Sequence, residues 1–265
     1  RTASELEIMA SVHVKVDSGM HRVGVQPDNA VRVASLVAES QWLTLDGMFT
    51  HLATADVADT QFAQQQVSTF MRAVEQVRAL EIEVRHVHIS NSASAIRRLD
   101  TGVGCTMTRV GIAMYGIPGD AATNSFGAAH QLDLRPVMSV HARVSHVQRV
   151  TAGQGVSYGL KRPLESDSTI ATLPLGYADG IPRGIWESGS VLVNGTRRAF
   201  AGVVTMDQIL VNCADDAVSI GDEAVLIGTQ GLELITANEW ANKMGTIGYE
   251  IVCAISARMP RNYIN

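Results

Sequence analysis

The stretch TRVGIAMYG, residues 108–116, opens with an arginine and continues as a short apolar run punctuated by Gly111 and Gly116. If residues 106–110 form a buried strand, Gly111 turns the chain at the carboxyl end of that strand. The backbone N–H groups of Gly111 and Ile112 then face outward as a seat for an anion, with Arg109 beside them. By itself the stretch slightly favours an ordinary buried strand whose arginine is paired at the rim, so the rest of the chain decides between the two interpretations.

Length and composition describe a soluble globular protein. The 265 residues are 46% hydrophobic with a net charge of -5, which is enough chain for two domains. No basic patch indicates a nucleic-acid partner, and neither a membrane-spanning apolar run nor a charged-then-apolar leader is present. Cys105, Cys213 and Cys253 are odd in number and scattered, which favours a reducing compartment and argues against a disulfide scaffold. We therefore expect a cytoplasmic protein that binds no nucleic acid and no membrane.

The first half of the chain alternates strand and helix patterns. The predicted strands cover residues 12–16, 43–50, 84–89 and 106–110, and the predicted helices are one capped by Asp28, one over residues 60–80 and one over residues 92–98. This alternation predicts parallel strands joined by right-handed crossovers.

The second half changes to period-two patterns. Apolar and polar residues alternate over 138–145, and Asn194-Gly195 separates two apolar runs as a hairpin turn does. Another strand is expected at 223–227, a capping box from Thr236 to Glu239 opens a helix, and a last helix carries Tyr249. We predict an α/β domain over residues 1–131 and a mostly antiparallel β domain over residues 132–265, with the linker at 119–131.

Four parallel strands with helical crossovers are half of a closed eight-stranded barrel. An isolated half would leave two long edges of unpaired backbone groups. The expected fold is therefore a partial (β/α)8 barrel of the TIM type, followed by the β domain, and we expect the supplied chain to lack an amino-terminal portion with further strands. The alternative is a small open, doubly wound sheet.

The carboxyl ends of the predicted parallel strands each carry polar residues, which core packing alone does not require. These clusters lie at residues 15–22, 50–56, 88–93 and 109–112. Each also has an ordinary explanation. Lys15 and Arg22 are then solvated loop charges, His51 is a satisfied core histidine, and Asn91-Ser92 is only a helix cap.

The ordered set of motifs resembles the alanine racemase family, whose members combine a barrel with a β domain and use pyridoxal 5'-phosphate. The resemblance covers residues 12–265 and rests on KVDSGMHRVG (15–24), THLATAD (50–56), HxxNSA (88–93), RxGIAMYG (109–116), VSYG (156–159), GYADG (176–180), MDQ (206–208) and YE (249–250). Each motif alone is weak, whereas their order together is specific.

The resemblance implies a cofactor site in the first domain. Ser92, Gly111, Ile112 and Tyr249 match the family's phosphate-binding positions, and Asn91 adjoins them. Arg109 matches the residue that faces the pyridine nitrogen, and His51 the residue against the pyridine ring. A guanidinium does not give up its proton, so the ring nitrogen stays unprotonated and the cofactor is a weaker electron sink than in aminotransferases.

The resemblance also implies substrate-binding and catalytic residues. Tyr158 matches the proton donor and acceptor on one face of the substrate carbon; free tyrosine titrates near pKa ~10, so a base role requires that value to be lowered. Arg22 and Met206 match positions that contact the substrate carboxylate, and Lys15 matches a lysine that is carbamylated in many members. The family forms a homodimer with shared active sites, so Tyr158 and Met206 are expected to serve the partner's site.

Two departures from the family pattern stand out. The lysine that binds the cofactor covalently lies in the family on the first barrel strand, and the lysines here, Lys15, Lys161 and Lys243, are in other contexts. Many relatives also carry an arginine where this chain has Val203. The supplied chain is therefore expected to be inactive by itself.

The leading hypothesis is an isomerase that interconverts L- and D-alanine and supplies D-alanine for peptidoglycan. One alternative is a non-catalytic fragment that binds pyridoxal phosphate or phosphate. Another is a metal-dependent hydrolase that uses His51, His86 and His88, since histidines two apart on a strand share one face.

Overall fold

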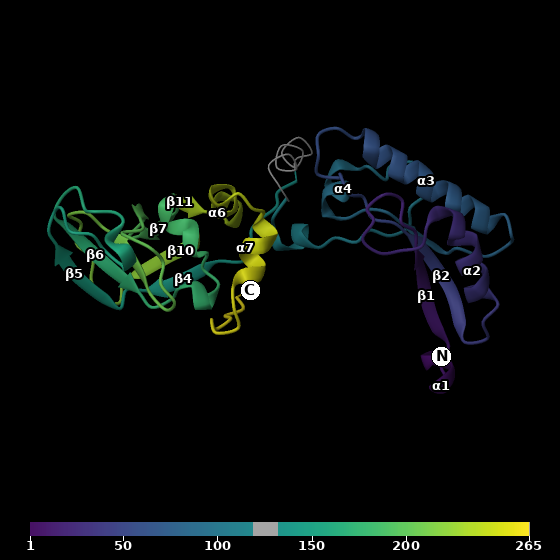
Figure 1. Ribbon diagram of the computed structural model, residues 1–265, viewed down its shortest axis with the longest axis horizontal. Coiled ribbons are helices and arrows are strands. Elements are labelled where there is room, and N and C mark those ends of the chain that lie inside the picture. Colours follow the sequence, from purple (N-terminus) through teal and green to yellow (C-terminus); the bar gives the residue numbers. More distant parts are fainter. Residues whose placement is uncertain (119–131, 265) are drawn as a thin grey trace. The chain divides into compact units, whose positions relative to one another are not determined.

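The computed structural model describes residues 1–118 and 132–264. The chain divides into two compact units, residues 1–134 and 135–265, which run from purple to teal and from teal to yellow in Figure 1. The predicted linker, residues 119–131, lies outside the described residues, so the predicted domain boundary at residue 131 stays a prediction.

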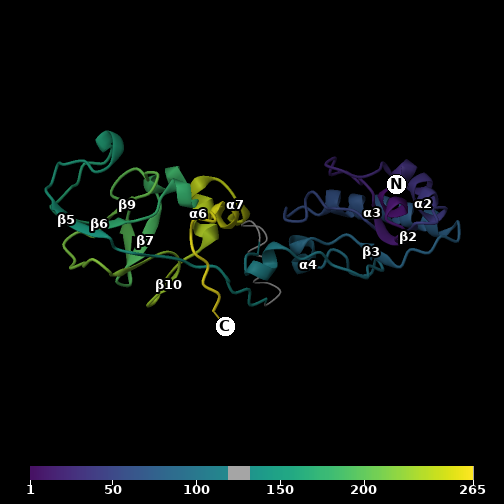
Figure 2. The same cartoon turned by 90° about the horizontal axis from the view of Figure 1, so that it is seen from below.

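The first unit is built on a parallel sheet with the strand order β1-β2-β3. Figures 1 and 2 show these strands beside the helices that connect them. The elements are α1 (Thr2–Glu5), β1 (Ala10–Lys15), η1 (Pro27–Asn29), α2 (Ala30–Ala38), β2 (Leu43–Phe49), α3 (Gln61–Arg78), β3 (His86–His88), α4 (Ser92–Arg97) and η2 (Ile112–Tyr115). The alternation of strand and helix expected up to residue 98 is confirmed.

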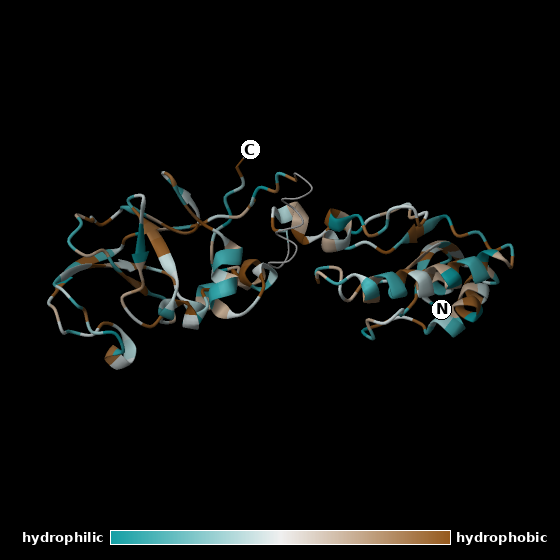
Figure 3. Cartoon of the chain, turned by 90° about the horizontal axis from the view of Figure 1, so that it is seen from above, coloured by the Kyte–Doolittle hydropathy of each residue, from teal (hydrophilic) through white to brown (hydrophobic). Residues whose placement is uncertain are grey.

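The long helix α3 holds this unit together through one apolar side. Phe70, Val74 and Val77 are fully buried and pack in one cluster with Met48 of β2 and Val87 of β3. Each such side chain contributes roughly 1.5–3 kcal/mol on burial. The helices of this unit carry both brown and teal surfaces in Figure 3, as amphipathic helices do. Packing of α3 on the sheet therefore holds the strand ends in place.

Two local predictions for the first unit were wrong. Residues 106–110 run beside β3 through the bonds Thr106 N–H to Val87 O (2.9 Å) and Arg109 N–H to Ser90 O (3.0 Å), but they form no regular strand and Val110 is 38% exposed. Among the described residues no strand covers their outer side. Asp28 does not cap α2, because Pro27 sets the backbone of a 3-10 turn that contains Asp28, and α2 begins after it.

The second unit consists of antiparallel sheets with two short α-helices. One sheet has the order β11-β10-β7-β8 with β4 also paired to β10, and the other has the order β5-β6-β9. The strands are β4 (Val140–Arg143), β5 (His146–Val150), β6 (Ser168–Leu173), β7 (Ser190–Val193), β8 (Thr196–Ala199), β9 (Ile209–Asn212), β10 (Glu223–Gln230) and β11 (Glu233–Ile235); the helices are η3 (Tyr158–Leu160), η4 (Tyr177–Asp179), η5 (Arg183–Glu187), α6 (Ala237–Met244) and α7 (Gly248–Ala254). The predicted antiparallel β domain is confirmed.

The sequence pattern predicted one strand over residues 138–145. The structure instead divides this run between two sheets. Val144 N–H donates to Asp222 O (2.9 Å), next to the β4 and β10 pair, whereas Ser145 N–H donates to Thr172 O (2.8 Å) at the end of β6. The chain therefore leaves one sheet and joins the other between these residues. Period-two alternation continues across the corner, so the pattern could not reveal it.

The predicted hairpin turn and the predicted helix cap of the second unit are confirmed. Asn194 and Gly195 both have positive φ, 52° and 74°, as a hairpin turn between β7 and β8 requires. Thr236 caps α6 by accepting a hydrogen bond from the Glu239 N–H (3.0 Å), and Gly245 ends the helix with φ 65°.

Candidate active site

Arg109 lies at the centre of the polar cluster at the strand ends of the first unit. Its Nη1 lies 2.6 Å from His88 Nδ1, and its Nη2 donates to the carbonyl of Thr50 at 2.8 Å. The guanidinium also lies 5.1 Å from the centre of the Phe49 ring. Within the described residues no carboxylate pairs with Arg109, and burial lowers its pKa from the usual value. The positive charge is therefore held by neutral partners and remains available to a ligand.

His51 follows β2 and faces this cation. Its Nδ1 lies 3.4 Å from Arg109 Nη2, and its Nε2 lies 3.5 Å from Asn91 Nδ2. Burial, followed by the charges of Arg109, Arg22 and Lys15, lowers the pKa of His51 to about 4. His51 is therefore a neutral imidazole at physiological pH, and the three cations predicted as site residues act on one place.

Ser92 and the turn at Gly111 are joined by hydrogen bonds at the start of α4. Ser92 is 4% exposed, and its Oγ accepts the N–H of Gly111 (3.0 Å) and the N–H of Ala113 (3.3 Å). A Cβ placed on Gly111 would meet nothing within 4 Å, so one side of this turn is open. Asn91 caps α4 through a bond from the Ser94 N–H (2.9 Å), which holds Ser92 at the helix start. Ile112 follows as the first residue of η2.

Lys15 is the last residue of β1, and Arg22 follows a turn that the buried carboxylate of Asp17 organises. Asp17 accepts the N–H groups of His21 (2.9 Å) and Gly19 (3.1 Å), and these bonds hold the pKa of its carboxyl below the usual value. The pKa of Lys15 is lowered, first by burial and then by Arg22, although Asp17 opposes this shift. Arg22 is exposed at the end of the turn.

Three residues that support the site were not selected from the sequence. Gln66 of α3 is fully buried, accepts the Ala53 N–H (2.8 Å) and donates to His51 O (3.2 Å). Thr50 is buried and donates its hydroxyl to Val16 O (2.8 Å). His88 contacts Arg109 directly, although the sequence suggested only a strand pair or a metal ligand. A polar residue within the apolar stripe of α3 was the available signal for Gln66.

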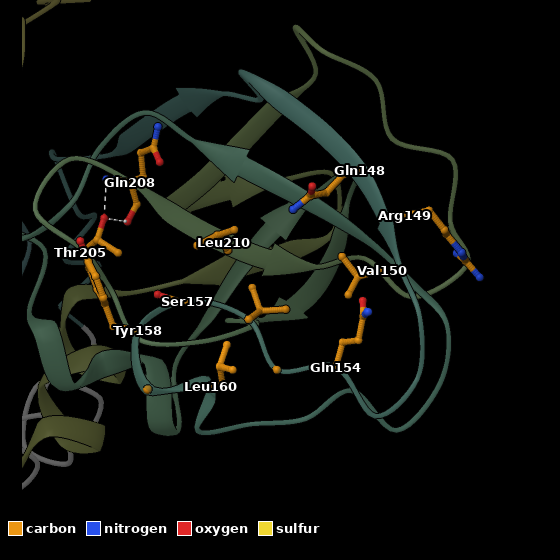
Figure 4. Close-up of a pocket in the computed structure, with 13 residues that line it drawn as sticks. Gln148, Arg149, Val150, Gln154, Ser157, Tyr158, Leu160, Thr205, Gln208 and Leu210 are labelled. Atoms are coloured by element: carbon orange, nitrogen blue, oxygen red, sulfur yellow. Dashed lines mark hydrogen bonds between the residues drawn. The ribbon is translucent and has the colours of Figure 1, made fainter.

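Tyr158 lies at an open hollow of about 760 Å³ in the second unit (Figure 4). Its side chain is 71% exposed, and Leu160, Thr205 and Gln208 line the hollow with it. The loop below is fixed because Ser157 Oγ donates to Val203 O (2.7 Å). The tyrosine hydroxyl is therefore presented outward on a firmly held loop.

Met206 lies at the tip of a turn that packs on the GYADG segment. The Tyr177 N–H donates to Thr205 O and the Ala178 N–H to Met206 O, both at 3.0 Å. A Cβ on Gly176 would lie 2.1 Å from Thr205 O, so only glycine permits this approach. Met206 is 53% exposed.

Val203, one of the two departures from the family pattern, and Tyr249, the remaining predicted site residue, also lie in the second unit. Val203 is 1% exposed and packs under the Tyr158 loop, and Tyr249 is the second residue of α7 with 37% exposure. The predicted site residues divide between the two units. The second unit carries Tyr158, Met206 and Tyr249, and the first unit carries the others: Lys15, Arg22, His51, Asn91, Ser92, Arg109, Gly111 and Ile112. The role of Tyr249 in binding phosphate stays a prediction.

The histidines considered as metal ligands form no such site in the described part of the chain. No three His, Cys, Asp or Glu side chains there are grouped so that they could hold a metal ion. His88 instead faces Arg109, and His86 Nδ1 lies 3.3 Å from Thr106 Oγ1.

Comparison with known proteins decides the family. The family description "Alanine racemase, N-terminal domain" matches residues 1–118, and "Alanine racemase, C-terminal domain" matches residues 137–263. Alanine racemase from Halothermothrix orenii is 39% identical over 266 residues, which is 100% of this chain and 68% of that protein. The chain belongs to the alanine racemase family.

Solved structures agree with this assignment to the alanine racemase family. Alanine racemase from the D-cycloserine-producing Streptomyces lavendulae has a TM-score of 0.91 at 34% identity and covers 99% of this chain and 68% of that one. Alanine racemase from Bacillus anthracis, solved with bound L-Ala-P, has a TM-score of 0.88 at 35% identity and covers 97% and 65%. The chain thus has the alanine racemase fold, a partial barrel followed by a β domain, and spans about two thirds of the length of these relatives.

Alanine racemases use pyridoxal 5'-phosphate, and the residues of the first unit fit this group chemically. A phosphate dianion requires donors, and the Ser92 hydroxyl, whose oxygen accepts the Gly111 N–H and whose hydrogen can point outward, supplies one beside the open side of the turn. An unprotonated pyridine nitrogen accepts a hydrogen bond, and Arg109 is a donor that carries no paired carboxylate in the described residues. The site is therefore suited to the cofactor of the family.

Because His51 and His88 are both neutral in the folded chain, we expect the first unit to lose stability in acid. Burial and the charge of Arg109 lower the pKa of His88 to about 4 in the folded chain, against 6.5 as the ordinary value. Between these pH values the unfolded chain binds more protons, so the unfolding free energy falls as the pH drops from 6.5 to 4, by roughly 1–3 kcal/mol for His88. The unfolding free energy is measured by urea unfolding at several pH values. Hydrogen exchange of the β2 and β3 amides is the signal that reports on the first unit.

The control for this acid effect is a surface histidine. His88→Asn should flatten the pH dependence, whereas His146→Asn should leave it unchanged, because His146 is exposed. Equal slopes in wild type and His88→Asn would contradict the assignment of the effect to His88.

Proposed function

We propose that the protein is an alanine racemase enzyme that interconverts L- and D-alanine with pyridoxal 5'-phosphate and supplies D-alanine for peptidoglycan precursors. The observation that carries this proposal is the meeting of Arg109, His51 and the Ser92 and Gly111 donors at the strand ends of one sheet. Each of these residues occupies a position that the family motifs assign to the cofactor.

The first unit binds and orients the cofactor. The Ser92 hydroxyl, whose oxygen accepts the Gly111 N–H and whose hydrogen can therefore point outward, would hold the phosphate together with the Ile112 N–H, while Asn91 fixes the start of α4. His51 lies against the ring, and its neutral state avoids a further positive charge beside Arg109. When bound, pyridoxal phosphate supplies the electron sink that weakens the bond between Cα and its hydrogen. Arg109 donates to the ring nitrogen and keeps it unprotonated.

Substrate is held by its carboxylate and exchanges its proton with a tyrosine. We assign the carboxylate contact to Arg22 and to the Met206 backbone N–H. The Tyr158 hydroxyl accepts or donates the Cα proton on one face of the substrate, and the firmly held loop limits its movement. Lys15 is assigned as a carbamylated lysine. Its lowered pKa favours the neutral amine, whose nitrogen adds to CO₂ with release of one proton, and the resulting anion orients Arg22.

A homodimer with shared active sites is part of the proposal. Tyr158 and Met206 are 71% and 53% exposed, as expected of residues that complete a site on a second copy. We also propose a cytoplasmic location, which agrees with the three free cysteines. In the described part of the chain, no helix is both long enough and apolar enough to cross a membrane.

An assay of D-alanine tests the proposed reaction. The full-length protein that contains this chain is incubated with pyridoxal phosphate and L-alanine, and both enantiomers are followed by chiral chromatography; we expect progress to an equal mixture. Binding of pyridoxal phosphate without D-alanine would instead identify a non-catalytic binding fragment. Borohydride treatment then shows whether a native lysine of the chain forms a covalent adduct.

A further inference from the structure

A line of polar side chains continues inward from Arg109 and crosses the parallel sheet. His88 Nδ1 faces Arg109 Nη1 at 2.6 Å, and His88 Nε2 lies 2.7 Å from Nδ1 of His13. The other nitrogen of His13, Nε2, lies 3.6 Å from Oδ2 of Asp46. The order Arg109, His88, His13, Asp46 thus joins β3, β1 and β2 behind the candidate active site.

The hydrogen positions along this line follow from the arginine. A guanidinium only donates, so His88 Nδ1 must be an unprotonated acceptor. A neutral His88 then carries its hydrogen on Nε2 and donates it to His13 Nδ1. His13 in turn carries its hydrogen on Nε2, on the side of the Asp46 carboxylate, which at 3.6 Å is too far for a hydrogen bond but close enough to attract this N–H. Arg109 and His88 each donate to the next group, and the carboxylate ends the series.

The surroundings support this arrangement of hydrogens. His88 is 4% exposed and stacks on Phe49, with 4.9 Å between ring centres and an interplanar angle of 5°. Phe49 also underlies the guanidinium of Arg109. Burial first, and then the charges of Arg109, His13 and His86, lower the pKa of His88 to about 4. The imidazole is therefore neutral and its ring orientation is fixed.

The backbone is shaped to admit His13 and Asp46. The register of β1 against β2 shifts between Val12 and His13, which pair with Leu45 and Gly47, so Asp46 is the extra residue of a bulge. A Cβ on Gly47 would lie 2.8 Å from His13 Nδ1 and 2.6 Å from His86 O. The bulge thus brings Asp46 beside His13, and the absence of a side chain at Gly47 leaves room for the imidazole.

We propose that His13 and Asp46 are positioning residues that fix the tautomer of His88. By fixing this tautomer they orient Arg109 toward the pyridine nitrogen, a role of Arg109 that rests on the proposed function. No proton moves along the line during turnover. Its task is to present Arg109 with a single permanent acceptor, so that the guanidinium does not rotate away from the ligand.

Other charged groups face the line and define the controls. Arg85 Nη1 lies 4.0 Å from Asp46 Oδ1, and the His86 ring stacks on His13 with 6.0 Å between centres. His86 makes no bond within the line, since its Nδ1 faces Thr106. Substitution of His86 therefore disturbs the same packing while leaving the series of hydrogen bonds intact.

The tautomers are measured directly by long-range proton–nitrogen NMR of the full chain labelled at histidine nitrogen. We expect the Nε2–H form for both His88 and His13. In His13→Phe the His88 signal should become a tautomer mixture, whereas His13→Asn, whose amide oxygen accepts, should keep the Nε2–H form. His86→Phe is the matched control and should leave the His88 signal unchanged. This measurement needs no catalytic activity, so it stands apart from the proposed function.

The holoenzyme supplies the second measurement. For His13→Phe we expect kcat to fall by about 10-fold to 100-fold with KM within about twofold, and for His13→Asn both values to stay within about threefold of wild type. Asp46→Leu, which removes the carboxylate that faces His13 Nε2, should shift the His13 tautomer even if His13→Phe does not fold. An Nδ1–H tautomer of His88 in wild type, or identical behaviour of His13→Phe and His86→Phe, would overturn the proposal.

Discussion

Replacement of Tyr158 with phenylalanine should lower alanine racemisation by about 10²- to 10⁴-fold, because the variant lacks the hydroxyl that accepts or donates the Cα proton. The loss in kcat/KM must be equal in both directions, since the two enantiomers have the same free energy and the equilibrium constant is one. Asymmetry is expected in proton exchange instead. In heavy water, the enantiomer whose Cα proton faces away from Tyr158 should still gain deuterium without inverting, as measured by NMR of recovered alanine.

Tyr263→Phe is the matched control for this experiment, because Tyr263 is 93% exposed near the end of the chain. It should racemise alanine at the wild-type rate. The exposed position of Tyr158 also makes a folding defect from removal of one oxygen a poor explanation of any loss. Full activity of Tyr158→Phe, or deuterium gain at equal rates in both enantiomers, would refute the role assigned to this tyrosine.

Arg109→Glu should lower racemisation by about 10²- to 10³-fold and create a new side reaction. A carboxylic acid in place of the guanidinium shares a proton with the pyridine nitrogen, and the stronger electron sink that results favours return of the proton to a different carbon. Slow formation of pyruvate from alanine is therefore expected, with the amino group passed to the cofactor and at most one pyruvate formed per cofactor molecule. Coupling pyruvate to a dehydrogenase measures it, while chiral chromatography measures the racemisation that remains.

Arg109→Lys separates charge from geometry in the same assay. Lysine keeps a cation but has no planar fork for His88 and the Thr50 carbonyl, and it can release its proton when buried. It should lose racemisation without gaining pyruvate formation. If Arg109→Glu produced no pyruvate and racemised as fast as wild type, the pyridine nitrogen would not be the partner of Arg109.

Much of the fold followed from rules that act over a few residues. The Asn194-Gly195 turn, the Thr236 cap and the amphipathic α3 were predictable because positive φ, capping bonds and helical periodicity depend only on neighbours along the chain. The family was also predictable from the order of short motifs, whereas the residues that these motifs assign to the site stay predictions. Such motifs keep residue types that the chemistry requires, whatever surrounds them.

The tertiary structure decided the contacts that join distant parts of the chain. His13 and His88 are 75 residues apart, and only the β1-β2-β3 order with a bulge at Asp46 brings them within 2.7 Å. The corner between Val144 and Ser145 and the irregular course of residues 106–110 were equally hidden, because side-chain alternation does not specify which strand lies alongside. The sequence alone thus indicated the family and predicted which groups meet a ligand, while packing between strands determined which of them hold one another in place.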